Sequence, residues 1–196
     1  VSSERAIARR LEHYPVPEQE HQLWVADQLI NIGGVALDVE LVENALAVSA
    51  KMVDELSLRA KGLTGLENPN SVAQLKQWIR DNMDTDTEIE SLDKKTVSAL
   101  LKATDPNQNV AQVLKIRQEM AKTSVKKYEA MEKAICQDGR VRGLIQFYGG
   151  QRTGRWAGRL VQVQNLPRNY IESLDTARDL VKKQKIDALK IIYGNV

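Results

Sequence analysis

The sequence predicts a mainly helical protein with one small β element. Aliphatic residues recur at helical spacing along most of the 196 residues, whereas phenylalanine occurs once, at Phe147. Side chains three and four residues apart share one face of a helix, so this spacing indicates helices that pack through aliphatic stripes. Residues that favour strands cluster at about 140–165, where we expect a short hairpin or sheet.

Caps and helix breakers divide the first half of the chain. A short helix from about Ser3 ends before Pro15 and Pro17, because proline lacks an amide donor and restricts the residue before it. Asp38 and Ser71 are suitable caps for the helices that follow. Helices are expected at about 18–32, 39–61, 71–82 and 94–103.

The second half contains the longest periodic run, at about 109–136, which predicts one long amphipathic helix. Asp138-Gly139 then turns the chain. The segments VRGLIQFY and RLVQVQ favour two short strands. Helices return at about 171–183 and 185–193. The expected architecture is therefore a pair of long antiparallel helices, 39–61 and 109–136, with a β hairpin at about 140–165.

The few cysteines and histidines argue against two kinds of site. Cys136 is the single cysteine, which excludes a disulfide framework and suits a reducing compartment. His13 and His21 are eight residues apart, off the i, i+4 spacing of a helical metal pair. No apolar run approaches the roughly 20 residues of a membrane span, and the first residues lack the apolar core of a signal peptide. We expect neither a metal site nor a membrane contact.

Charge is distributed unevenly along the chain. Residues 1–109 carry 11 Lys and Arg against 18 Asp and Glu, whereas residues 110–196 carry 17 against 8. Such asymmetry indicates that the second half meets a polyanion. The alternative is a solvated helical surface that happens to be unevenly charged. Residues 139–171 contain six arginines and no acid, which favours the polyanion.

The segment FYGGQRTGRWAGRLVQVQNLPRN, residues 147–169, combines these arginines with glycines. Gly149 and Gly154 have the spacing of a phosphate-binding loop, but the lysine and hydroxyl that complete such a loop are missing. Contact with nucleic acid fits better, because arginine offers a fork of donors to phosphates and base edges. The amides of Gln164 and Asn165 suit the minor-groove acceptors that every base pair presents. The alternative is a soluble basic hairpin with Trp156 as core filler.

The same residues carry a resemblance to a known family. Thr153-Gly154-Arg155, followed after eight residues by Gln164-Asn165-Leu166-Pro167, resembles the TGR…QNLP segment of family A, polymerase I-like DNA polymerases. Gly34 to Asp38 is similar to the GV-x-(L/V)-D start of the thumb, and Asn68 to Leu75 to the N-x-NS-x-x-QL helix start. The GGQRTGRWAGR version is most similar to phage and prophage members, and the resemblance covers nearly the whole chain.

The resemblance implies a fragment with three parts. Residues 1–17 would be the end of a 3′–5′ exonuclease-like domain and a linker, 18–136 the helical thumb, and 137–196 the first part of the palm. Family members place such an arginine and amide pair on primer–template DNA, with a turn shaped by Thr153 and Gly154. The residues expected to contact DNA are Thr153, Gly154, Arg155, Arg159, Gln164, Asn165, Arg152, Lys122 and Lys126. For the lysines, a solvated helix face is an equal alternative.

The sequence departs from the family pattern before and after TGR, and Tyr148 and Gln151 stand where the family has Gln and Thr. Ala157 and Gly158 stand where two serines are usual, so two hydroxyl contacts are missing, and Arg159 is a candidate to compensate for them through phosphate. Nucleotidyl transfer also needs two carboxylates that hold paired divalent metals, and in the family these follow QNLP at some distance. The acids Glu172, Asp175, Asp179 and Asp187 have helical periodicity and are interpreted as helix surface.

We therefore expect no catalytic residue, metal or cofactor in this chain, and no polymerase activity from it alone. Mg²⁺ and deoxynucleoside triphosphates would serve the full-length protein, in the cytoplasm of a bacterial host. The partner expected for the chain is primer–template DNA, and the chain itself would be a monomer. Two alternatives remain: a stand-alone, non-catalytic nucleic-acid-binding module, and a purely structural helical protein.

Overall fold

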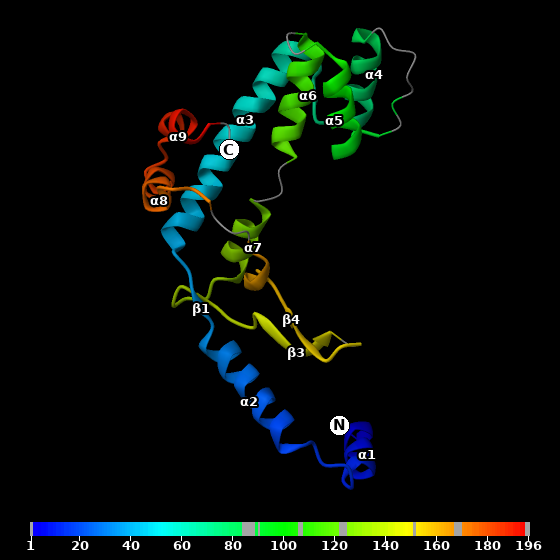
Figure 1. Cartoon of the computed structure of the whole chain (residues 1–196), viewed down its shortest axis with the longest axis vertical. Helices are drawn as coiled ribbons and strands as arrows, with labels where there is room; N and C mark the ends of the chain where they lie inside the picture. The colour runs from blue at the N-terminus through cyan, green and yellow to red at the C-terminus, as the bar shows by residue number, and fades with distance from the viewer. Residues whose placement is uncertain are drawn as a thin grey trace. The chain divides into compact units, whose positions relative to one another are not determined.

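The computed structural model describes residues 2–83, 89, 91–105, 108–121, 125–150, 152–166 and 170–194. These residues are mainly helical and form two small antiparallel sheets of two strands each, which confirms the predicted fold class (Figure 1). Within these ranges, no helix combines the length and the apolar character that crossing a membrane would require.

Packing divides the chain into two compact units, and each unit draws on two separate stretches of sequence. The first unit comprises Val1–Val39 and Ala130–Glu172, and the second comprises Glu40–Glu129 and Ser173–Val196. Parts of the expected thumb segment, 18–39 and 130–136, therefore pack in the same unit as the hairpin. The assignment of exonuclease-like, thumb and palm roles to segments stays a prediction.

The first unit combines two helices with both sheets. α1 (Ser2–Leu11) and α2 (Glu18–Gly33) precede β1 (Val35–Ala36), which pairs antiparallel with β2 (Arg140–Val141). β3 (Ile145–Gly150) and β4 (Arg155–Gly158) form the hairpin, drawn in yellow in Figure 1, and the short helix η1 (Val163–Asn165) follows. A small core of Val141, Leu144 and Val161 lies beneath the hairpin, and all three side chains are buried.

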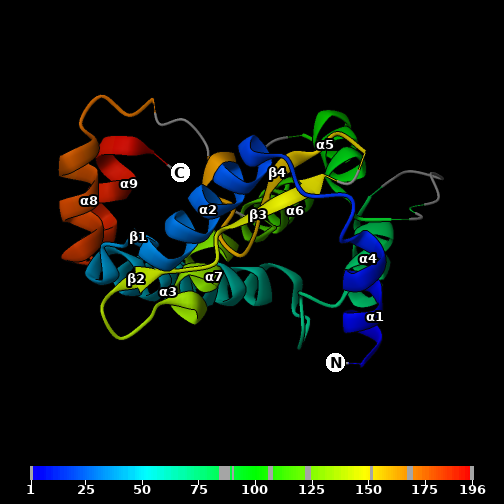
Figure 2. The ribbon, with the colours of Figure 1, turned by 90° about the horizontal axis from the view of Figure 1, so that it is seen from below.

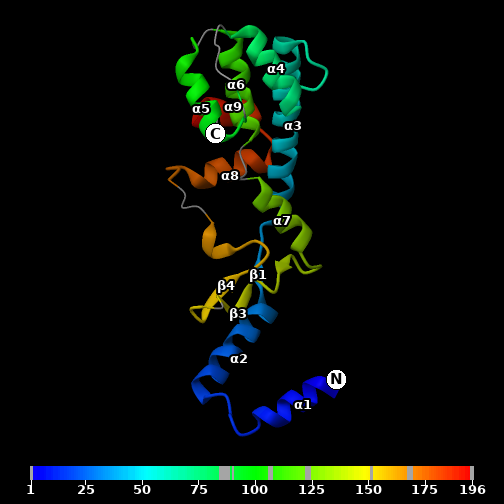
Figure 3. The same cartoon turned by 90° about the vertical axis from the view of Figure 1, so that its right-hand side faces the viewer.

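The second unit is built on α3 (Val39–Thr64), with α4 (Val72–Asn82), α5 (Lys94–Ala103) and α6 (Asn109–Met120) gathered at the C-terminal end of α3 (Figures 1 and 3). Ser71 accepts a hydrogen bond from the Gln74 amide at the start of α4, and Asp93 accepts one from Thr96 at the start of α5, as expected of caps. The core residues are Leu75, Ile79, Ile89, Val97, Leu100, Val110, Val113 and Leu114.

Two C-terminal helices complete the second unit. α8 (Leu174–Lys182) and α9 (Ile186–Tyr193) lie side by side (Figure 2). Polar contacts hold them on α3: Gln184 Nε2 donates to Asn44 Oδ1 at 2.6 Å, and Lys190 Nζ pairs with Glu55 Oε2 at 2.8 Å. The Lys190 ammonium group also lowers the pKa of Glu55, chiefly through this hydrogen bond. The helices predicted at 171–183 and 185–193 are thus confirmed.

The prediction of one continuous helix over 109–136 is wrong. α6 ends at Met120, and a separate helix, α7 (Lys126–Ala134), begins six residues later. The α6 cap residue, Ala121, donates its backbone N–H to Arg117 O and Glu119 O. The sequence between the helices contains Thr123, Ser124 and Val125, which are weaker helix formers than alanine. The apolar periodicity therefore continued across a break in the helix.

The second predicted strand, RLVQVQ at 159–164, is also wrong. β4 occupies Arg155–Gly158 and ends before this segment. Leu160 and Gln162 have φ values of 52° and 50°, a left-handed conformation that interrupts a regular strand, and β4 ends before them. The residues that follow form the 3₁₀ turn of η1. The β-forming residues in this segment instead supply Val161 to the small core.

Candidate nucleic-acid interface

The hairpin is anchored on α2 through a polar contact. Asn31 Nδ2 donates to Ile145 O at 2.8 Å, and the Ile145 amide donates to Asn31 Oδ1 at 3.0 Å, so one side chain pairs both backbone groups at the start of β3. Asn31 Nδ2 also lies 3.1 Å from Oδ2 of Asp27, which is 2% exposed. The sequence analysis missed this pair. Its signal is two polar residues at i, i+4 within an apolar helical run.

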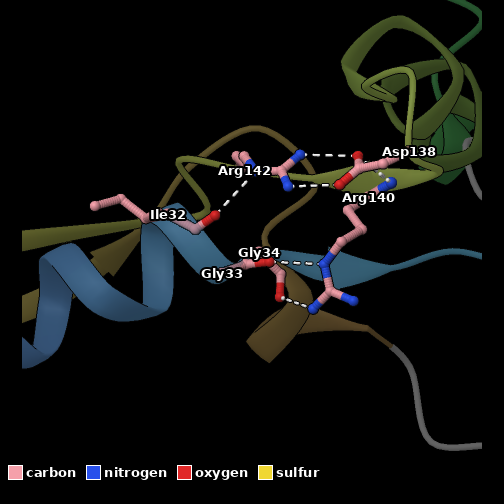
Figure 4. Close-up of polar contacts among 6 residues, drawn as sticks. All are labelled: Ile32, Gly33, Gly34, Asp138, Arg140 and Arg142. Carbon is pink, nitrogen blue, oxygen red and sulfur yellow. Dashed lines mark hydrogen bonds and ion pairs between the residues drawn. The ribbon is translucent and has the colours of Figure 1, made fainter.

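Two of the six arginines serve the protein itself (Figure 4). Arg140 donates from Nε to Gly33 O at 2.7 Å and from a terminal nitrogen to Gly34 O at 2.9 Å. Arg142 donates to Ile32 O at 2.9 Å. Both side chains thus bind the carbonyl groups at the C-terminal end of α2, which lack partners within the helix.

Arg142 also forms a bidentate ion pair with Asp138, with nitrogen–oxygen distances of 2.9 and 2.6 Å (Figure 4). The hydrogen bonds from Arg142 are the main reason that the pKa of Asp138 falls to about 2. The same pairing raises the pKa of Arg142. The side chains of Arg140 and Arg142 therefore hold the end of α2 against the segment that leads into the hairpin.

Three other arginines are free to meet a ligand. Arg152, Arg155 and Arg159 are exposed, and no residue in the described part of the chain forms an ion pair or a side-chain hydrogen bond with them. No acidic residue occurs anywhere from 139 to 171, so nearby sequence supplies no neutralising charge. Unneutralised positive charge of this kind attracts polyanions. The sixth arginine, Arg168, lies outside the described residues.

The turn between β3 and β4 is tight. The amides of Thr153 and Gly154 both donate to Gly150 O at 2.9 Å. Gly154 has a φ of 63°, and a Cβ there would lie 2.9 Å from the Tyr148 ring. Thr153 and Gly154 therefore form the turn between the strands. Their contact with DNA stays a prediction.

Gln164 and Asn165 lie on η1 rather than on a strand, and both are exposed. Asn165 Nδ2 donates to Gln162 Oε1 at 3.0 Å. The Gln164 amide reaches back over β4: a Cβ on Gly158 would lie only 1.7 Å from Gln164 Nε2. Gly158 thus provides the space in which this amide lies. The structure brings Gln164 next to the strand that carries Arg155.

The two predicted lysines lie outside the hairpin segment of the sequence. Lys122 lies outside the described residues. Lys126 is exposed at the first position of α7 and packs with the second unit, whereas the hairpin residues belong to the first. Contact of either lysine with phosphate stays a prediction.

Acidic side chains do not gather into a site in the described ranges. No group of three or more His, Cys, Asp or Glu side chains there is close enough to hold a metal ion. Asp175 pairs with Arg178 at 3.3 Å and Asp179 with Lys183 at 3.6 Å. Both carboxylates are exposed on α8, as is Asp187 on α9, which confirms that these three acids are helix surface, whereas Glu172 is exposed in a turn before α8. We assign no step of a metal-dependent reaction to this chain.

Comparison with known proteins gives one clear similarity. The chain is 55% identical, over all 196 residues, to a DNA polymerase of Bacillus phage SP02. It spans about 30% of the length of that phage protein. No protein-family model matches the chain, and no solved structure matches it. The similarity includes the hairpin, η1 and both packing units.

Proposed function

We propose that this chain is part of a phage-type, template-directed DNA polymerase of family A, and that its role is to grip the primer–template duplex. The observation that carries the proposal is the set of three exposed arginines on and directly after the hairpin, which have no partner among the described residues, in a chain 55% identical to a phage DNA polymerase. Arginine binds phosphates through paired donors, and duplex DNA offers two rows of them.

Each hairpin residue has a separate role in this proposal. Arg152, Arg155 and Arg159 contact phosphates and groove edges from an exposed turn and strand. Gln164 and Asn165 present side-chain amides to minor-groove acceptors, which are present in every base pair. Such contacts accept any sequence, as a replicating enzyme requires. Lys122 and Lys126 are proposed as additional phosphate contacts of the thumb.

The remaining functional assignments are also proposals. Catalytic carboxylates, Mg²⁺ and nucleotide binding belong to the full-length protein, so the 196-residue chain alone should not extend a primer. The full-length protein would replicate DNA in the cytoplasm of a bacterial host. We propose that the chain itself is a monomer.

The test is duplex binding by the full-length protein, measured by fluorescence anisotropy over a range of salt concentrations. We expect Arg155→Ala to weaken binding about 10-fold and to reduce the salt slope by about 1. The loss should be equal for duplexes of different sequence, because backbone and minor-groove contacts carry little sequence information.

The matched control is Arg178→Ala. Arg178 is also exposed, but it is already paired with Asp175 at 3.3 Å. This variant should bind as the wild type does. Equal loss in both variants, or a loss confined to one DNA sequence, would contradict the proposal.

A further inference from the structure

The hairpin carries three aromatic side chains, of which Phe147 contacts the other two, and we name them the aromatic platform: Phe147, Tyr148 and Trp156. The Phe147 ring lies 4.7 Å from Tyr148 and 6.2 Å from Trp156 between centroids, both in edge-to-face geometry. Phe147 is half-buried, whereas Tyr148 is 49% exposed and Trp156 is 37% exposed. Trp156 is too exposed to be core filler, which was the alternative interpretation of this residue.

The backbone holds Tyr148 in an unusual conformation. Its φ of 52° is left-handed, which is uncommon and costly for an aromatic residue. Gly154 makes room for the ring, since a Cβ there would lie 2.9 Å from it. Interaction with the carboxylate of Glu20 on α2 raises the pKa of Tyr148. The ring is thus fixed from two sides while half of its surface faces solvent.

Trp156 shares a face with a predicted DNA contact. Successive side chains on a strand point to opposite faces, so Trp156 and the Cβ direction of Gly158 lie on the same side of β4. The Gln164 amide lies on that side, because its Nε2 would be 1.7 Å from a Cβ on Gly158. Trp156 and Gln164 therefore face the same side. Arg155 precedes Trp156 and by the same rule points to the other side of β4, where it is exposed and has no partner within the described residues.

Exposed rings on a hairpin that also carries exposed arginines match the chemistry of one class of ligand. Proteins bind single-stranded nucleic acid by stacking bases on aromatic side chains within a positively charged surface. A base inside a duplex is already stacked on both faces, so it offers no free face to a ring. An unpaired base does. Phosphate contacts alone would require the arginines but not the rings.

We propose that the aromatic platform stacks an unpaired DNA base at the junction between duplex and single strand. This inference rests on the proposed function, because it places the junction beside the duplex that the hairpin arginines bind. It adds a specificity that the arginines cannot supply: preference for DNA with an overhang over blunt duplex.

The experiment compares two hairpin DNAs with the same duplex, one blunt and one with a single-stranded overhang. The overhang carries 2-aminopurine as its first unpaired base, because stacking quenches its fluorescence. Binding by the full-length protein is measured by anisotropy. We expect the wild type to prefer the overhang DNA by about 5-fold to 150-fold and to quench the reporter.

Three variants isolate the platform. Trp156→Leu should lose most of the preference and the quenching but retain its affinity for blunt duplex, which also shows that it is folded. Trp156→Phe should retain most of both. The matched control, Trp24→Leu, removes a tryptophan that is 46% exposed on α2, where it stacks on His21 rather than beside arginines. It should behave as the wild type does.

The outcomes separate the two proposals. Tight binding of blunt duplex without overhang preference, or an undiminished preference in Trp156→Leu, overturns the platform and leaves the proposed function standing. Binding of neither DNA by the wild type overturns both. A preference lost equally in Trp24→Leu and Trp156→Leu also overturns the platform, because the effect would not be specific to the hairpin.

Discussion

Replacing Gly158 with alanine should displace the Gln164 amide while leaving the hairpin intact. A Cβ at residue 158 would lie 1.7 Å from Gln164 Nε2 and 2.5 Å from Gln164 Cδ. All three of its nearest neighbours belong to the end of that one flexible side chain, and none to the backbone. Gly158 is not among the residues with positive φ, so alanine fits the backbone without strain.

The size of the effect follows from the geometry. To reach an ordinary contact of 3.4 Å, Nε2 must withdraw by about 1.7 Å from its present distance of 1.7 Å. A hydrogen bond of about 2.9 Å does not survive such a shift. Loss of one bond to DNA costs about 0.5–1.5 kcal/mol, so duplex affinity should fall by about 2-fold to 13-fold. The salt slope should not change, because no charge is removed.

The assay is duplex binding by the full-length protein, with Gly158→Ala, Gln164→Ala and the double variant compared. Because both substitutions act through one amide, the double variant should bind as weakly as Gln164→Ala, not more weakly. Wild-type affinity in Gly158→Ala beside weakened binding in Gln164→Ala would refute the reasoning. Additive losses would refute it as well.

Three further changes test the scaffold. Asn31→Ala removes both hydrogen bonds to the backbone of Ile145 and should lower the stability of the first unit by about 1–3 kcal/mol, measured by urea denaturation. Leu114→Ala empties a fully buried position of the second unit and should cost about 2–5 kcal/mol in the same assay, whereas the exposed Leu58→Ala should cost little. Asp138 has a pKa of about 2 in the folded protein against 3.8 ordinarily, so its pairing with Arg142 stabilises the fold above about pH 4 and ceases to do so as the pH falls through 2. The difference in unfolding midpoint between wild type and Asp138→Asn should therefore shrink from pH 5 to pH 2, and a constant difference would contradict this.

Local signals in the sequence predicted most of the helices. Ser71, predicted as a cap, accepts an amide hydrogen bond at the start of α4, a feature visible within four residues of sequence, and Asp93 plays the same part at α5. The β hairpin was expected in the correct region, because glycines and β-forming residues cluster there. The prediction from periodicity failed at the break between α6 and α7, because the apolar spacing continues across it and neither proline nor glycine marks it in the sequence.

The orientation of α2 also required the structure. The apolar residues Leu23, Leu29 and Ile30 lie at helical spacing on α2, yet they are 40%, 65% and 44% exposed. The side of α2 that meets the hairpin instead carries Asp27 and Asn31. A helical pattern shows which residues share a face, but it does not show which face a neighbouring strand will meet.

The sequence located the candidate site, but it did not show which arginines bind the protein's own backbone and which are exposed. Arg140 and Arg142 differ from Arg152 and Arg155 only in what lies opposite them, namely carbonyl groups more than 100 residues earlier in the chain. The contact between Gly158 and Gln164 likewise depends on how η1 turns back over β4. Such contacts depend on tertiary structure, and no periodic pattern in the sequence predicts them.

The pairing of β1 with β2 has a consequence for synthesis of the protein. Val35 pairs with Val141, 106 residues later, and the intervening stretch contains most of another packing unit. A ribosome must therefore release both partners before this ladder can close, by which time the helices of residues 40–129 have already emerged. Closing a long loop costs less entropy when the loop has become compact. Folding of residues 40–129 before the ladder closes would therefore lower the entropy cost of joining the two halves of the discontinuous unit.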